Sequence, residues 1–153
     1  MTLASDIALL RQTPFFESFS EEHLKLIAFS AESRSFAAGM VLYEEGQLLH
    51  SAYIIGSGRL EAVRKERDGE ATRAIGPGET LAERALLLET RARETVTVTE
   101  AATALQMRRP VFRRFLEEYP EIATLLRARI AARLGLAAAE YRAAGERLTA
   151  AGR

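Results

Sequence analysis

The chain has 153 residues, of which 48% are hydrophobic and 27% are charged, a balance typical of one globular domain rather than of a disordered segment. Its formal net charge of +0 gives no reason to expect a nucleic acid or an anionic membrane as partner, and the lack of cysteine excludes disulfides, thiolate zinc sites and iron–sulfur clusters. The N-terminus lacks the apolar run of a signal peptide, and no stretch approaches the roughly 18 apolar residues of a membrane span, so we expect a cytoplasmic protein.

The first two thirds of the chain are predicted to be helices followed by short strands. Residues 5–10 and 21–33 have helical spacing, and Ser20 suits the N-cap position of the second helix. The sequence then changes to short apolar runs separated by glycines, which is typical of an antiparallel sandwich or barrel. Asp68-Gly69 predicts a two-residue hairpin between two of these strands. The candidate strands are residues 41–43, 53–55, 60–63, 71–75, 95–99 and 104–107.

After Pro110 the pattern returns to helix. Residues 111–118 predict a short helix, which should end near Tyr119-Pro120 because proline disfavours helical geometry in the residue before it. Residues 121–148 predict a long helix with apolar positions spaced as in a heptad repeat. This face fits a dimer seam or a cover over the strands equally well, so a homodimer through this helix is one expected assembly. The seam positions are Ile130, Leu134, Ala137, Tyr141, Ala144 and Leu148.

The segment from Gly76 to Val98 carries the most informative motif. It contains a glycine turn, a short helix that opens on Glu83, two arginines at Arg91 and Arg93, and an alternating strand. A carboxylate and a guanidinium about ten positions apart, on either side of one helical turn, suit a ligand that carries both a hydroxyl and a phosphate. Backbone N–H groups at a helix N-terminus and the planar fork of arginine both favour an anion.

This arrangement resembles the phosphate-binding cassette of the cyclic-nucleotide-binding domain, a family that includes the catabolite activator protein and the regulatory subunits of protein kinase A. Residues 15–20, 36–46 and 52–63 also resemble the entry segment, the first strand pair and the central hairpin of that family. The resemblance implies an α+β fold, in which an antiparallel β-roll (a double-stranded jelly roll) is flanked by N-terminal helices and a long C-terminal helix. It implies a single domain over residues 1–153, with N-terminal helices at 1–35, the β-roll at 36–107, the cassette at 76–98 and C-terminal helices at 108–153.

The resemblance also implies roles for individual residues. Glu83 would accept a hydrogen bond from the 2′-hydroxyl of a cyclic nucleotide, and the N–H groups near Arg84 and Ala85 would face its phosphate. The phosphate arginine would be Arg93, ten residues after Glu83. Arg91 remains a competitor, because many family members place this arginine nine residues after the glutamate, between the two candidates. The predicted ligand-binding set is Leu81, Ala82, Glu83, Arg84, Ala85, Arg91, Arg93 and Thr95.

Several residues depart from the family pattern. Ala82 stands where glycine is usual, which is harmless at negative φ and costly at positive φ. Leu81 replaces a usual aromatic residue. Glu94 follows the arginine where a small residue is usual: pointing inward, it would repel a phosphate and compete for the guanidinium, and pointing outward it would have no effect. Ala137 to Ala139 offer no side-chain hydrogen bond to a purine.

Two other classes of protein are disfavoured. A cupin-type metalloenzyme needs several histidines on facing strands, but only His23 and His50 are present, so we expect no metal site and no catalytic residue. No helix-turn-helix follows the long helix before Arg153, so we expect no DNA binding by this chain alone.

The sequence therefore predicts a regulatory module rather than an enzyme. It would bind a cyclic mononucleotide, cAMP or cGMP, as a regulatory ligand rather than a cofactor, and would signal to an unknown protein by moving its C-terminal helix. One alternative is a degenerate domain that retains the fold for protein interaction or dimerisation, as the departures at Ala82 and Glu94 suggest. Another is the effector-domain fragment of a longer transcription regulator.

Overall fold

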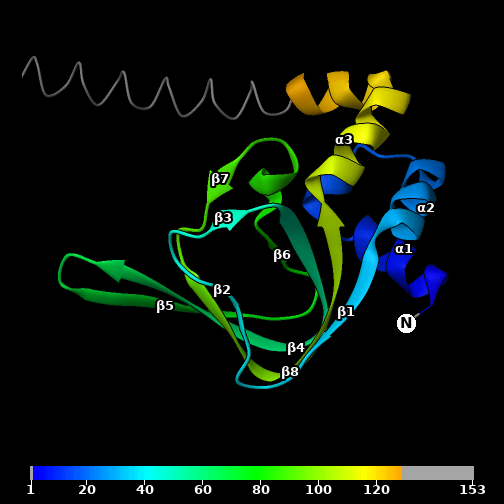
Figure 1. Cartoon of the computed structure of the whole chain (residues 1–153). Coiled ribbons are helices and arrows are strands. Elements are labelled where there is room, and N and C mark those ends of the chain that lie inside the picture. The colour runs from blue at the N-terminus through cyan, green and yellow to red at the C-terminus, as the bar shows by residue number, and fades with distance from the viewer. Residues whose placement is uncertain (1, 129–153) are drawn as a thin grey trace, which may run out of the picture. The chain divides into compact units, whose positions relative to one another are not determined.

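The computed structural model describes residues 2–128, in which helices precede and follow a set of antiparallel strands along the chain (Figure 1). The helices are α1 (Leu3–Arg11), η1 (Pro14–Phe16), α2 (Glu21–Ser30), η2 (Glu83–Leu86) and α3 (Arg109–Glu118), where η marks a 3-10 helix, and residues 120–128 are also helical. The strands are β1 (Glu32–Phe36), β2 (Val41–Tyr43), β3 (Leu48–Leu49), β4 (Ser51–Glu66), β5 (Gly69–Ile75), β6 (Thr80–Leu81), β7 (Thr90–Arg91) and β8 (Thr95–Arg108). This order confirms the predicted α+β fold.

Side-chain caps fix the starts of the two N-terminal helices. Thr2 and Ser5 form a capping box at α1, each side chain accepting a hydrogen bond from the backbone of the other. Ser20 caps α2 as predicted, because its hydroxyl accepts a hydrogen bond from the N–H of His23 at 3.2 Å. The prediction that this helix reaches residue 33 was wrong: α2 ends at Ser30, and the chain continues as β1, which pairs with β8.

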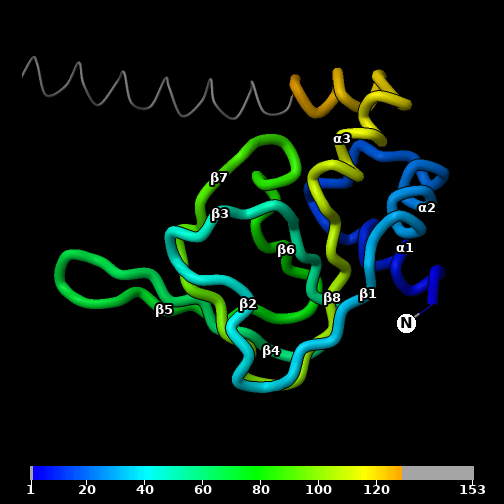
Figure 2. The backbone as a smooth tube through the Cα atoms, viewed as in Figure 1, coloured from blue at the N-terminus to red at the C-terminus, as the bar shows by residue number. Residues whose placement is uncertain are grey.

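The main sheet is built on two long strands. Its strand order is β1-β8-β4-β5, with β2 paired to β8 and β6 paired to β4, and every pairing is antiparallel. A second, two-stranded sheet joins β3 to β7. Figure 2 traces the chain from β6 through η2 to β7, where it turns back beside β3. This path is therefore anchored at one end by the pairing of β6 with β4 and at the other end by the pairing of β7 with β3.

The two long strands correct the sequence prediction, which had divided each of them into two. A single strand, β4, spans both predicted segments at 53–55 and 60–63, and β8 spans those at 95–99 and 104–107. Gly58 lies within β4 at φ +86°, where the register between β4 and β8 shifts. The glycine that suggested a break between strands is thus accommodated inside one strand as an irregularity.

The hydrophobic interior of residues 2–115 includes the core of the β-roll and a group of aromatic side chains. Aliphatic residues from both long strands form the core of the β-roll, among them Ile55, Leu60, Val96 and Val98, each at most 1% exposed. Phenylalanines from η1, from the residues near it and from α3 form the other group, with ring centroids 5.0 to 6.1 Å apart. The members of the aromatic group are Phe15, Phe16, Phe19, Phe112 and Phe115.

The C-terminal predictions are tested only in part. As predicted, α3 ends at Glu118, directly before Tyr119-Pro120. The chain divides into two compact units after Phe115. The second unit, which starts at Leu116, is described only as far as residue 128. The heptad seam from Ile130 to Leu148 and the purine-facing region from Ala137 to Ala139 lie outside the described residues.

Candidate functional site

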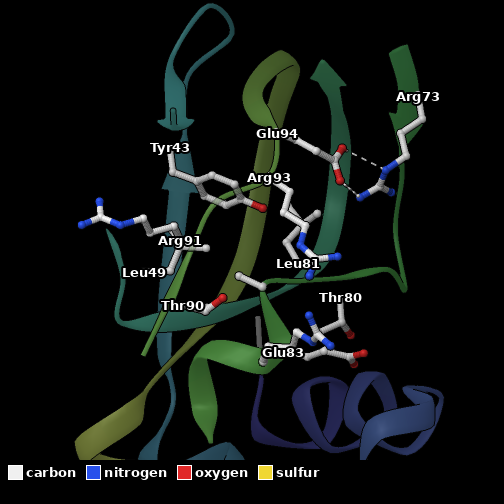
Figure 3. A pocket seen from close by; sticks show the side chains of 12 residues that line it. Tyr43, Leu49, Arg73, Thr80, Leu81, Glu83, Thr90, Arg91, Arg93 and Glu94 are labelled. Atoms are coloured by element: carbon white, nitrogen blue, oxygen red, sulfur yellow. Dashed lines mark hydrogen bonds and ion pairs between the residues drawn. The ribbon is translucent and has the colours of Figure 1, made fainter. Parts of the chain in front are cut away.

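A pocket of about 260 Å³ lies where the short strands and η2 meet the β-roll (Figure 3). Two lining residues, Tyr43 and Leu49, come from β2 and β3, and one, Arg73, comes from β5. The others belong to the segment that the sequence analysis singled out, between residues 76 and 98. Those residues are Thr80, Leu81, Ala82, Glu83, Arg84, Thr90, Arg91, Arg93 and Glu94.

Backbone hydrogen bonds attach this segment to β4. The N–H of Gly78 donates to the carbonyl of Ile55 at 2.8 Å, and the N–H of Ile55 donates to the carbonyl of Glu79 at 2.9 Å. The turn continues into η2, where Ala85 and Leu86 are buried and anchor it to the core. Because these two side chains point inward, Glu83 and Arg84 at the start of η2 are left to line the pocket.

Ala82 adopts a backbone conformation that L-residues rarely adopt. Its φ of 59° and ψ of 35° lie in the left-handed region, and among residues 2–128 no other non-glycine residue has positive φ. This geometry costs an alanine roughly 1–2 kcal/mol, because the Cβ atom approaches the following carbonyl oxygen. Alanine in place of glycine at position 82 therefore strains the backbone and lowers the stability of the fold.

The two candidate arginines have different surroundings. Arg91 lies on β7 and donates to the carbonyl oxygen of Gly46 at 2.9 Å. Arg93 makes no hydrogen bond or ion pair with any residue between 2 and 128, and Figure 3 shows it pointing into the pocket while Arg91 points away. Glu83, half-buried, lines the same pocket. Arg93 is therefore the arginine of the two whose guanidinium is available to a ligand.

Two members of the predicted set do not line the pocket. The N–H of Ala85 donates to the carbonyl of Ala82 at 2.9 Å, so it closes the 3-10 turn rather than facing a ligand. The Thr95 hydroxyl accepts a hydrogen bond from the N–H of Glu45 at 3.0 Å and ties the start of β8 to the turn after β2. Both residues thus help to hold the site together without lining it.

Glu94 points into the pocket, but its partner is Arg73 rather than Arg93. The Nε and Nη2 atoms of Arg73 each donate to one carboxylate oxygen of Glu94 at 3.1 Å, which makes a bidentate ion pair. This hydrogen bonding raises the pKa of Arg73 above the usual arginine value, so the guanidinium stays charged. Burial and the nearby charge of Glu94 raise the pKa of Tyr43 to about 12, so its hydroxyl stays neutral.

A sequence profile of the cyclic nucleotide-binding domain matches residues 33–119, more than half of the chain. The chain belongs to the cyclic nucleotide-binding domain family. It is 37% identical to a cyclic nucleotide-binding-like protein from Brucella abortus, whose structure aligns with 73% of this chain and 97% of that chain at a TM-score of 0.67. The regulatory domain of Toxoplasma gondii PKA, solved with cAMP, is 26% identical over 74% of this chain and 44% of that chain, at a TM-score of 0.68.

Relatives of this cyclic nucleotide-binding domain include much longer proteins. The cyclic AMP receptor protein of Thermus thermophilus is 27% identical over 82% of this chain and 59% of its own length. Lysophospholipase NTE1 of Chaetomium globosum is 29% identical over 71% of this chain but only 7% of its own length. The similarity to the lysophospholipase is thus confined to a region that matches the cyclic nucleotide-binding domain.

Metal-binding groups and membrane-spanning helices can both be assessed among the described residues. Between residues 2 and 128, no group of three or more His, Asp or Glu side chains could hold a metal ion. In the same part of the chain, no helix is long and apolar enough to cross a membrane.

Sequence reasoning missed four polar residues of the pocket lining: Tyr43, Arg73, Thr80 and Thr90. Tyr43 and Arg73 come from strands outside the segment from 76 to 98, and neither belongs to a motif. The alternation of β5 carried a weak signal, because Arg73 shares a strand face with the inward-facing Ile75. Recognising the ion pair required the register that sets β5 beside β4 and β4 beside β8.

Proposed function

We propose that this domain binds a cyclic mononucleotide, cAMP or cGMP, in the pocket between η2 and the β-roll. The observation that carries the proposal is that Glu83 and Arg93 line one pocket, and that Arg93 has no partner between residues 2 and 128. A charged guanidinium without a partner favours an anion, and a half-buried carboxylate favours a hydroxyl donor. A cyclic nucleotide offers both groups on a single rigid ring system.

In this proposal the Arg93 guanidinium binds the cyclic phosphate and Glu83 accepts a hydrogen bond from the ribose 2′-hydroxyl. Thr80 and Thr90 also line the pocket, and the hydroxyl of Thr90 can donate to a ligand oxygen. The Thr80 oxygen is buried and has no hydrogen-bond partner within residues 2–128, so it is not exposed to a ligand in this structure. Two relatives favour cAMP as the first ligand to test, because one was solved with cAMP and the other is a cyclic AMP receptor protein.

We further propose that ligand binding is read out through the C-terminal helix and that the chain forms a homodimer through it. A ligand shifts such an equilibrium only by its difference in affinity for the two states. The expected regulatory signal is therefore a ligand-dependent change in assembly or in binding of a downstream protein.

Titration calorimetry with cAMP and cGMP on nucleotide-free protein tests the binding proposal. Arg93→Ala should weaken binding by roughly 13- to 160-fold, since a hydrogen bond to a charged group contributes roughly 1.5–3 kcal/mol. Glu83→Ala should weaken it about tenfold. Arg91→Ala should change affinity by less than threefold, because its guanidinium is bound to the Gly46 carbonyl. No heat with either nucleotide, or wild-type affinity in both Arg93→Ala and Glu83→Ala, would contradict the proposal.

A second candidate function is a degenerate domain that serves protein interaction or dimerisation. The positive φ of Ala82 favours it, because glycine would fit this turn without strain. Light scattering with and without nucleotide separates the two candidates. The degenerate domain should form the same assembly in both conditions and show no calorimetric binding.

A further inference from the structure

A second carboxylate lines the pocket directly beside the proposed phosphate arginine. Glu94 follows Arg93 in the chain, lines the same pocket, and has a side chain only 26% exposed. An unpaired carboxylate in this position would repel an anionic ligand and compete for the Arg93 guanidinium. A pocket for an anion therefore needs some device that neutralises Glu94.

Arg73 provides that neutralisation through geometry set by the sheet. Ala62 on β4 is the register partner of both Arg73 on β5 and Val96 on β8. Register partners lie on the same face of a sheet, so Arg73 shares the inward face with Val96 and lies two strands from β8, about 10 Å away. Ala62 is fully buried and has only a methyl group, so the long side chain of Arg73 can pass over it toward Glu94.

The resulting ion pair has the geometry of a specific contact rather than an incidental surface pair. Both carboxylate oxygens of Glu94 accept a hydrogen bond from Arg73 at 3.1 Å, and Figure 3 shows this carboxylate directed toward Arg73. Arg73 also lies 3.9 Å from Glu79 in the turn before β6, so it links β5, the turn and the start of β8. Because the carboxylate of Glu94 pairs with Arg73, it does not pair with Arg93. The guanidinium of Arg93 remains unpaired within residues 2–128.

We propose that Arg73 is a positioning residue that sets the affinity of the pocket for anions by holding Glu94 away from Arg93. It regulates the site without touching the phosphate of the ligand. The inference rests on the proposed function, since it concerns how the same pocket accepts a cyclic phosphodiester. It also explains how a glutamate is tolerated next to the phosphate arginine.

The test is a double-mutant cycle on Arg73 and Glu94, read as cAMP affinity by calorimetry. Arg73→Ala should weaken binding about tenfold, because Glu94 then loses its partner and acts on the anion and on Arg93. Glu94→Gln alone should leave binding unchanged or tighten it by a few fold. The double variant Arg73→Ala/Glu94→Gln should return to within about threefold of wild type, because the repelling charge is gone.

Two further variants separate positioning from general structural damage. Arg11→Ala removes a similar exposed ion pair, Arg11–Glu21 at 2.7 Å, between α1 and α2 and outside the pocket lining, and should not change affinity. Arg73→Lys keeps the charge but loses the bidentate geometry, so its affinity should fall between those of wild type and Arg73→Ala. A purely structural defect in Arg73→Ala would not be reversed by a second substitution at Glu94.

The outcomes for this proposal and for the proposed function are distinct. Wild-type affinity in Arg73→Ala, a tenfold loss in Glu94→Gln, or a double variant as weak as Arg73→Ala would each overturn the role of Arg73 while leaving cyclic-nucleotide binding intact.

If wild type binds neither cAMP nor cGMP, the proposed function fails, and the same cycle is read with inorganic phosphate through the Nε–H NMR signal of Arg93. Phosphate that shifts this signal in wild type and the double variant, but not in Arg73→Ala, would still support the role of Arg73. The absence of that difference would overturn it.

Discussion

At the scale of single residues, Ala82 is a stability cost located at the ligand pocket. Ala82→Gly should raise the free energy of unfolding by about 0.5 kcal/mol, because the relief of left-handed strain exceeds the added entropy of the unfolded chain. Urea denaturation measures this change in the free energy of unfolding. Ala74→Gly is a matched control on the exposed part of β5, and there the same substitution should destabilise. A loss of stability in Ala82→Gly equal to that of the control would contradict the prediction.

Asp6 is a second residue that lowers the stability of the fold, in this case because its carboxyl group is buried. Its side chain lies on α1, the residue is 7% exposed, and its Oδ1 atom has no hydrogen-bond partner within residues 2–128. Burial raises the pKa of this carboxyl above its ordinary value of 3.8, so the ionised form is disfavoured in the folded state. The cost is therefore absent at low pH and develops as pH rises from about 3.8 through the folded pKa.

Asp6→Ala should consequently stabilise the protein at pH 7 by about 1 kcal/mol, and the gain should shrink toward pH 4. Urea denaturation at several pH values measures this dependence. Asp68→Ala, in the exposed hairpin loop, serves as the control for removal of an acidic side chain and should change stability little at pH 7. A gain in stability for Asp6→Ala that grows as the pH falls would contradict the predicted pH dependence.

At the scale of elements, Gly58 determines how closely β4 and β8 can approach. A Cβ atom at this position would overlap the carbonyl oxygen of Ala101 and the backbone of Ala102, and φ is +86°. Gly58→Ala should therefore destabilise the fold by about 2–3 kcal/mol. Gly39→Ala is the matched control, since its φ is +92° but nothing lies within 4 Å of the added atom. Equal losses in thermal denaturation would show that strain rather than close contact determines the cost.

The elements also show what the sequence could and could not predict. Local signals located the β-rich region, the cap of α2, the end of α3 and the hairpin between β4 and β5. The turn residues of that hairpin are Arg67 and Asp68 rather than Asp68 and Gly69, because Glu66 pairs with Gly69. Glycine is a good signal of irregular backbone, but by itself it does not distinguish a turn from an irregularity within a strand such as Gly58.

The candidate site was predictable only where its residues are close in the sequence. Glu83, Arg91 and Arg93 belong to one continuous segment, so their spacing could be read directly. Arg73 and Tyr43 reach the pocket through strand pairing, and no local pattern encodes that register. The choice between Arg91 and Arg93 as the arginine open to a ligand depended on the carbonyl of Gly46, 45 residues before Arg91.

At the scale of the whole molecule, ligand binding should be visible as added stability. A ligand that binds only the folded state stabilises it by about 2.7 kcal/mol at a concentration of 100 times its Kd. For a chain of 153 residues this corresponds to a rise in Tm of roughly 5–10 °C. The rise should fall to about half or less in Arg93→Ala at the same cAMP concentration, because its weaker affinity leaves only about 0.3–1.3 kcal/mol of stabilisation. Arg11→Ala should keep the full shift, since its ion pair with Glu21 lies outside the pocket. An equal rise in wild type and Arg93→Ala would mean that cAMP stabilises the protein from a site other than this pocket.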